Sequence, residues 1–146
     1  MKIKQLSVFL ENQPGALSRP VNILAKGRFN LLALSLADTQ QFGILRLILP
    51  DWERAVKLLE KEGFVVKVTD LVALEAADAP GGLAAILAAL ERTQVNLEYM
   101  YGFTLAKEGK AMLVFRFDDP DRAIAALQKK GINPVRSVEL FRGLGG

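Results

Sequence analysis

The sequence contains no cysteine and no histidine among its 146 residues. These absences exclude disulfides, thiol nucleophiles, the Cys/His sets that bind zinc, and a histidine base in a catalytic triad. No Gly-x-Ser-x-Gly elbow, P-loop or dinucleotide-binding Gly-x-Gly-x-x-Gly motif follows a predicted strand. We therefore expect a protein that is not an enzyme and that has no catalytic residue, metal site or cofactor.

Clustered charge and long apolar runs are also scarce. The 19 basic and 16 acidic residues are spread along the chain, without the basic face that nucleic-acid binding requires. No apolar stretch reaches the roughly 18–20 residues of a membrane span, and no signal-peptide pattern opens the chain. We expect a cytoplasmic protein with no nucleic-acid or membrane partner, and the 51% hydrophobic content suffices for one medium or two small domains.

The chain carries one structural unit twice. Asn-Gln-Pro-Gly-Ala-Leu at residues 12–17 lies between a strand pattern and a helix pattern, and Asp-Ala-Pro-Gly-Gly-Leu at residues 78–83 has the same context. The prolines of the two turns are 66 positions apart, and the pairs Asn30-Leu31 and Asn96-Leu97 share that spacing. A fixed period indicates a duplicated unit. The sequence therefore predicts two domains, residues 1–70 and residues 71–146.

Hydrophobic periodicity predicts the order β-α-β-β-α-β in each copy. In the first copy we expect strands at 2–10, 30–37, 42–49 and 64–68, and helices between 17 and 27 and between 51 and 63. In the second copy we expect strands at 71–76, 95–105, 112–117 and 134–141, and helices at 83–90 and from 118 to 131. The fold class is α+β, with two ferredoxin-like units whose antiparallel sheets lie side by side and whose helices lie on one face.

Two helix starts carry specific expectations. In the first helix, Ser18 is expected to be the cap and Pro20 to lie in the first turn, where a missing N–H is tolerated. The acidic residues Asp118, Asp119 and Asp121 are expected to complement the start of the last helix rather than to bind a metal.

With this repeat and these turns, the chain resembles a tandem ACT-domain protein of the stand-alone, two-domain kind. The likeness lies in the Asn/Asp-x-Pro-Gly-x-Leu turn and the Asn-hydrophobic pair of each copy, and in the runs at residues 34–39, 42–46 and 98–101. ACT domains are ferredoxin-like regulatory modules that bind amino acids. The resemblance covers essentially the whole chain, and it implies a non-catalytic sensor of a free amino acid that regulates an enzyme or another protein partner.

The resemblance also implies ligand pockets between the Pro-Gly loops and strands of a neighbouring unit. The candidate ligand-binding residues are Asn12, Gln13, Pro14, Gly15, Ala16, Leu17, Ser35, Asp78, Ala79, Pro80, Gly81, Gly82, Leu83, Tyr99 and Tyr101. The chemistry suits a zwitterion, because bare backbone and helix-start amides attract a carboxylate while Asn12 or Asp78 can hold an ammonium group. Asn12 departs from the family pattern, in which Asp is common, and cannot form an ion pair.

Other interpretations remain open at this stage. Asn12 and Asp78 could only cap helices, Tyr99 and Tyr101 could only pack against the sheet, and Ser35 could be a small residue at the edge of the core. A rival hypothesis is a dimeric interaction subunit that binds no ligand.

Both hypotheses predict a homodimer. Helices cover one face of each sheet, and apolar residues remain on the other face, with Phe9, Phe103 and Val114 as candidates. The tail at residues 143–146 is expected to fray.

Overall fold

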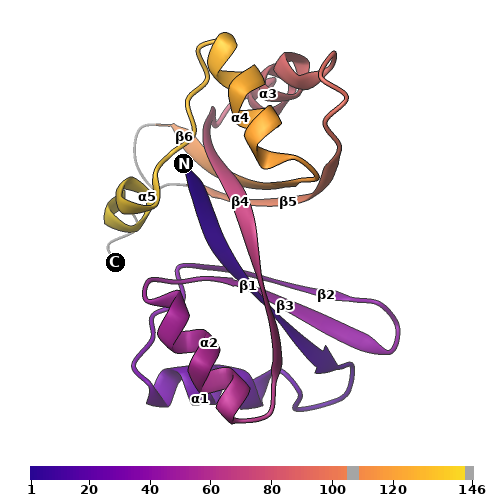
Figure 1. Ribbon diagram of the computed structural model, residues 1–146, viewed down its shortest axis with the longest axis vertical. Helices are drawn as coiled ribbons and strands as arrows, with labels where there is room; N and C mark the ends of the chain where they lie inside the picture. Colours follow the sequence, from indigo (N-terminus) through magenta and orange to yellow (C-terminus); the bar gives the residue numbers. More distant parts are fainter. Residues whose placement is uncertain (105–108, 144–146) are drawn as a thin grey trace. The chain divides into compact units, whose positions relative to one another are not determined.

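The computed structural model describes residues 1–104 and 109–143 (Figure 1). Contacts divide the chain into two compact units, with the division between Thr69 and Asp70. The N-terminal unit comprises Lys4–Thr69, and the C-terminal unit comprises Met1–Ile3 with the residues from Asp70 onward. Residues 144–146 of the tail that is expected to fray lie outside the described residues.

The N-terminal unit packs two helices on one face of its strands. Its strands pair antiparallel, β3 with both β1 and β2. The core contains Leu6, Val8 and Leu10, the face of β1 that the alternation predicts. Its elements are β1 (Lys2–Glu11), α1 (Ser18–Lys26), β2 (Ala33–Asp38), β3 (Phe42–Ile48), α2 (Trp52–Lys61) and the start of β4 (Val65–Ala77).

The C-terminal unit repeats this arrangement, with β6 paired antiparallel to β4 and to β5. Its core joins β4 and β6 to α3 and α4, and Phe115 stacks on Phe117 with ring centroids 5.5 Å apart. Its further elements are α3 (Gly82–Leu90), β5 (Leu97–Thr104), β6 (Lys110–Phe117), α4 (Pro120–Lys129) and α5 (Ser137–Gly143). The hydrogen-bonded strand order is β2-β3-β1-β4-β6-β5, which confirms the predicted fold class of two β-α-β-β-α-β units.

The expected strand at 134–141 is wrong, because the chain forms α5 there. The Glu139 carboxylate accepts the backbone N–H of Arg136 at 3.4 Å, and the Arg136 carbonyl accepts the N–H of Leu140 at 2.9 Å. A carboxylate that reaches back to a helix-start amide favours a helix over a strand. Within the range of the expected strand, the Val135 backbone N–H donates a hydrogen bond to the carbonyl of Ala73 on β4 at 2.8 Å.

The start of β1 belongs to the C-terminal unit and provides its fourth strand position beside β4. The Lys2 ammonium lies 3.1 Å from the Asp121 carboxylate, and the Gln128 amide donates to the Met1 sulfur at 3.3 Å. Both partners lie on α4, so this helix fastens the first residues of the chain.

The start of α1 differs in detail from the expectation. The cap position is Leu17, without a side-chain hydrogen bond, so the prediction of Ser18 as the cap is wrong. Pro20 is buried in the first turn, where its missing N–H has no intrahelical acceptor to lose. At α4 the prediction is confirmed, since the Asp119 carboxylate accepts the N–H of Arg122 at 3.1 Å and Pro120 follows it.

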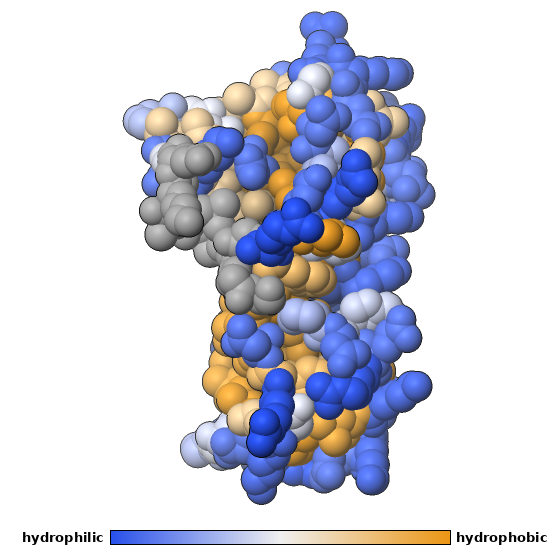
Figure 2. Space-filling view, turned by 90° about the vertical axis from the view of Figure 1, so that its left-hand side faces the viewer, coloured by the Kyte–Doolittle hydropathy of each residue, from blue (hydrophilic) through white to orange (hydrophobic). Residues whose placement is uncertain are grey.

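The apolar sheet face opposite the helices differs between the units. Val114 is fully buried within the chain, and Leu140 of α5, which lies away from α3 and α4 in Figure 1, is 1% exposed. Phe9 in the N-terminal unit remains 39% exposed, and Phe42 is 53% exposed. The side chain of Phe103 lies outside what the structure describes. Figure 2 shows apolar surface on the N-terminal unit.

Among the helices of the described residues, none is long and apolar enough to cross a membrane.

Candidate functional site

The first Pro-Gly loop is closed by Asn12. Its side-chain amide donates to the Gln40 carbonyl at 3.1 Å, and its backbone N–H donates to the Gln41 carbonyl at 3.1 Å. Gly15 then turns the chain with φ +82°, and apart from its two chain neighbours no described residue has a heavy atom within 4 Å of where a Cβ would stand. Asn12 therefore fixes the loop against the β2–β3 hairpin, and Gly15 leaves open backbone above α1.

The backbone N–H groups of this loop differ in whether they donate a hydrogen bond to another described residue. The N–H of Ala16 donates to the Gln13 carbonyl at 3.2 Å, whereas those of Gly15 and Leu17 donate to no acceptor within residues 1–104 and 109–143. Free N–H groups at the start of a helix carry positive character and suit an anion. The loop can therefore receive a negatively charged group.

A hollow of about 400 Å³, called here the edge hollow, lies between this loop and the strands β2 and β3. Apolar Leu10, Leu17 and Leu36 line it, together with Glu11 and Asp38. Leu36 is 55% exposed, so the hollow opens at the edge strand β2. Asn12, Gln13 and Ala16 complete its loop side.

A second hollow, of about 480 Å³, lies on the other side of the same loop, beside the start of β4; we call it the clamp hollow. Glu11 and Arg19 line it, and neither forms an ion pair in the part of the chain that the structure describes. Phe9, Phe64 and Val65 supply apolar surface, and the loop contributes Gln13, Pro14, Gly15 and Ala16.

Arg19 also connects the two helices of the N-terminal unit. Its guanidinium donates to the Glu62 carbonyl, just past the end of α2, at 2.7 Å. It lies over the Phe64 ring at 4.6 Å from the centroid. These contacts orient the guanidinium without neutralising its charge.

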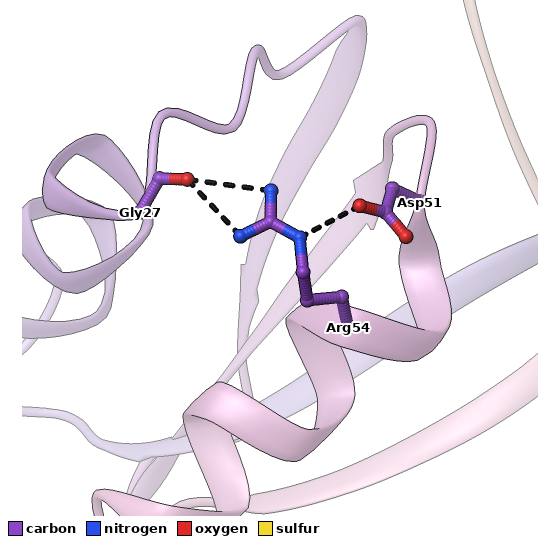
Figure 3. Close-up of polar contacts among 3 residues, drawn as sticks. All are labelled: Gly27, Asp51 and Arg54. Atoms are coloured by element: carbon purple, nitrogen blue, oxygen red, sulfur yellow. Dashed lines mark hydrogen bonds and ion pairs between the residues drawn. The ribbon is translucent and has the colours of Figure 1, made fainter.

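Arg54 makes the reverse connection from the start of α2 to the end of α1 (Figure 3). Both of its terminal nitrogens donate to the Gly27 carbonyl at 3.3 Å, and its guanidinium lies 3.9 Å from the Phe29 centroid. Its Nε donates to the Asp51 carboxylate at 2.7 Å. Asp51 is therefore the cap residue by position, while its side chain binds Arg54 rather than a backbone amide.

The second Pro-Gly loop is built differently. A hollow of about 360 Å³ lies beside it, lined by Pro80, Gly81 and Gly82. Glu75 also lines it, but its carboxylate pairs with the Lys110 ammonium at 3.3 Å. A Cβ at Gly82 would clash with the Ala77 carbonyl, so the chain is too close there for any side chain.

Comparison with known proteins agrees with this architecture. The family described as "ACT domain pair" matches residues 1–142. This chain belongs to the ACT domain pair family.

Solved structures extend the likeness. Protein BT0572 from Bacteroides thetaiotaomicron is 39% identical, with a TM-score of 0.89 over 97% of each chain. The ligand-free regulatory subunit of aspartate kinase from Thermus thermophilus is 14% identical, with a TM-score of 0.61 over 86% of this chain and 91% of that one. At this identity the second comparison shows a shared fold only.

One curated protein shares part of the sequence. The acetolactate synthase small subunit of Buchnera aphidicola subsp. Baizongia pistaciae is 32% identical over 77 residues, which is 49% of this chain and 48% of that protein. The match thus spans about half the length of that relative.

Only some of the predicted ligand-binding residues line the hollows beside the two Pro-Gly loops. Residues 12–17 line the two hollows of the first loop, and Pro80, Gly81 and Gly82 line that of the second. Asp78, Ala79 and Leu83 line none of the hollows described above. The Asp78 N–H instead donates to the Gly109 carbonyl at 2.8 Å.

Ser35, Tyr99 and Tyr101 occupy a different surface. Ser35 pairs in register with Arg46, and the two tyrosines pair with Arg116 and Val114, on the sheet face opposite the helices. None of the three lines any of the three hollows described above. Their predicted role in ligand binding stays a prediction.

The acidic cluster at the start of α4 is engaged. Asp118 accepts the N–H of Asn96 at 2.9 Å, and the Asn96 carbonyl accepts the N–H of Asp118 at 3.0 Å. The second Asn-Leu pair of the ACT repeat is thus tied to the end of β6. Asp119 caps α4 and Asp121 pairs with Lys2.

Sequence reasoning missed Glu11 and Arg19. A signal was available, because their counterparts 66 positions later are Ala77 and Ala85. Opposite charges that occur in only one copy of an ACT repeat are not required by the shared fold. They therefore mark the first loop as chemically distinct from the second.

Proposed function

We propose that this protein is a non-catalytic regulatory protein that binds a free amino acid at its first Pro-Gly loop. The observation that carries the proposal is the clamp hollow of about 480 Å³, which is lined by the Glu11 carboxylate and the Arg19 guanidinium. Within the part of the chain that the structure describes, neither group forms an ion pair. A zwitterion complements both charges, and pockets of roughly 300–1,000 Å³ suit small molecules. Membership in the ACT domain pair family supports the same reading.

The ligand class follows from the walls of the hollows. Phe9, Phe64 and Val65 border the clamp hollow, and Leu10, Leu17 and Leu36 border the edge hollow. An amino acid with an apolar side chain would bury that side chain against these residues. Among the described residues that line the second hollow, the carboxylate of Glu75 is already paired with Lys110, so we assign this hollow no amino acid.

A thermal-shift screen of the twenty amino acids tests the proposal. A ligand at 100 times its dissociation constant adds about 2.7 kcal/mol of stability. Glu11→Gln should remove most of this shift because it removes the negative partner of the ammonium group. Glu75→Gln, beside the second loop, is the matched control and should keep it. No shift with any amino acid would overturn the proposal.

The regulatory output requires a partner, and the relatives suggest its kind. The curated relative is a small subunit of acetolactate synthase, and the aspartate kinase neighbour is a regulatory subunit. We propose that amino-acid binding shifts the population of one packing of this chain, which a partner enzyme then reads. In affinity capture, the amount of partner bound to this protein should differ between samples with and without the amino acid.

The edge strand β2 favours a homodimer. Leu34 and Leu36 are 51% and 55% exposed on this strand, and Phe42 is 53% exposed on its neighbour β3. Exposed apolar edge strands are sites of pairing with another chain. Light scattering after gel filtration measures the oligomeric state, and Leu34→Lys should shift it toward the monomer. A dimer without any ligand response would instead support an interaction subunit.

A further inference from the structure

Arg19 and Arg54 form related connections within the N-terminal unit. Each lies in the first turn of one helix, donates to a carbonyl just past the end of the other helix, and lies over a phenylalanine ring two residues further on. The two sets are separated by a constant 35 positions: Arg19 and Arg54, Gly27 and Glu62, Phe29 and Phe64. The unit therefore contains one clamp twice, in opposite directions between α1 and α2.

The clamps differ in one component. Arg54 has a carboxylate partner, Asp51, three residues before it, and the distance from Nε to the carboxylate oxygen is 2.7 Å. The position 35 residues before Asp51 is Ala16, which has no charged group. Arg19 accordingly has a carbonyl and a ring as partners but no ion pair among the residues the structure describes.

A carboxylate placed beside Arg19 as Asp51 is placed beside Arg54 would lie in the clamp hollow. Ala16 and Arg19 both border the clamp hollow, and Gly15 leaves the backbone beside them bare. A carboxylate that entered here could take the geometry that Asp51 has beside Arg54. Arg19 could then keep its bond to the Glu62 carbonyl, as Arg54 keeps its bonds to Gly27.

We propose that Arg19 binds the α-carboxylate of the amino acid in the clamp hollow, in the place that Asp51 holds beside Arg54. Glu11, which lines the same hollow, pairs with the α-ammonium group. This assignment rests on the proposed function and defines the orientation of the ligand. It also gives the ligand a structural effect, because a bound carboxylate completes the clamp between the start of α1 and the end of α2.

The experiment compares paired ligands and matched variants by isothermal titration calorimetry. The probes are L-valine, L-leucine, L-isoleucine, L-methionine and L-phenylalanine, each with its amide, which keeps the ammonium group and lacks the carboxylate. We expect the wild-type protein to bind at least one acid, and to bind its amide about 10- to 100-fold more weakly, as expected for a lost charged hydrogen-bond pair. Arg19→Gln should weaken the acid by a similar factor and leave the amide unchanged.

Arg54→Gln is the control, because it removes the related clamp without touching the hollow. It should change the affinity by less than about twofold, well below the effect of one charged hydrogen bond. Hydrogen exchange supplies a second readout: the acid should slow exchange at the end of α2 in the wild type and in Arg54→Gln, but not in Arg19→Gln.

The two proposals fail in different ways. If the wild-type protein binds none of the acids, both the Arg19 assignment and the apolar amino-acid ligand are wrong. If an acid binds equally to wild type and Arg19→Gln, or as well as its amide, only the Arg19 assignment is overturned.

Discussion

The clamp from Arg54 should stabilise the N-terminal unit to a degree that its contacts allow us to estimate. An i,i+3 ion pair contributes about 0.3–0.5 kcal/mol, and an exposed cation–π contact about 0.5–1 kcal/mol. The hydrogen bonds to the Gly27 carbonyl add roughly 0.5–1.5 kcal/mol. Because the Arg54 side chain is 54% exposed, values near the lower ends apply. Arg54→Ala should therefore cost about 1.3–1.5 kcal/mol.

Urea denaturation followed by tryptophan fluorescence measures this cost. The chain has one tryptophan, Trp52, which packs against the core of the same unit. Asp51 has a φ of 58°, a backbone conformation that Asp and Asn tolerate better than Ala, so Asp51→Asn is the matched change for the ion pair. It removes the negative charge and should cost only about 0.3–0.5 kcal/mol. Arg54→Lys keeps the charge but loses the fork and the stacked plane, so it should behave nearly like Arg54→Ala. A cost below 0.5 kcal/mol for Arg54→Ala, on the order of a neutral surface change, would refute the clamp.

Three further substitutions test other parts of the structure. Gly82→Ala places a Cβ against the Ala77 backbone carbonyl and should lower thermal stability by about 1–3 kcal/mol. Gly81→Ala should cost less, because the new side chain meets no neighbouring atom among the described residues and only the positive φ is unfavourable. Leu140→Ala should destabilise the protein by about 2–5 kcal/mol, because the Leu140 side chain of α5 is buried. Val138 on the same helix is 64% exposed, so Val138→Ala should be nearly neutral. Thermal melts followed by circular dichroism distinguish the two outcomes. Asn12→Ala should cost about 0.5–1.5 kcal/mol in urea denaturation, because it removes the bond to the β2–β3 hairpin.

Local sequence patterns predicted most of the fold. The repeated Pro-Gly turns, the alternation of Leu6, Val8 and Leu10, and the Asp-Pro pair at the start of α4 are each patterns within short stretches of chain. The error at α5 has a local cause. Val135 and Val138 favour a strand, whereas the Glu139 carboxylate, which bonds back to the start of the helix, carried the opposite signal.

The candidate site was only partly predictable. The Pro-Gly turns located the loops, because proline and glycine restrict or free the backbone locally. The role of Arg19 depends on Glu62 and Phe64, more than forty positions away, and only the folded chain brings them together. The contrast with Ala85 in the second copy showed that the loops differ, but not what the charge contacts.

A crystal structure with a bound apolar amino acid tests the central claim most directly. The account predicts ligand density in the clamp hollow, between Glu11, Gly15 and Arg19, with the carboxylate toward Arg19. Density beside Gly81 alone, or a first loop that stays empty at saturating amino acid, would contradict it.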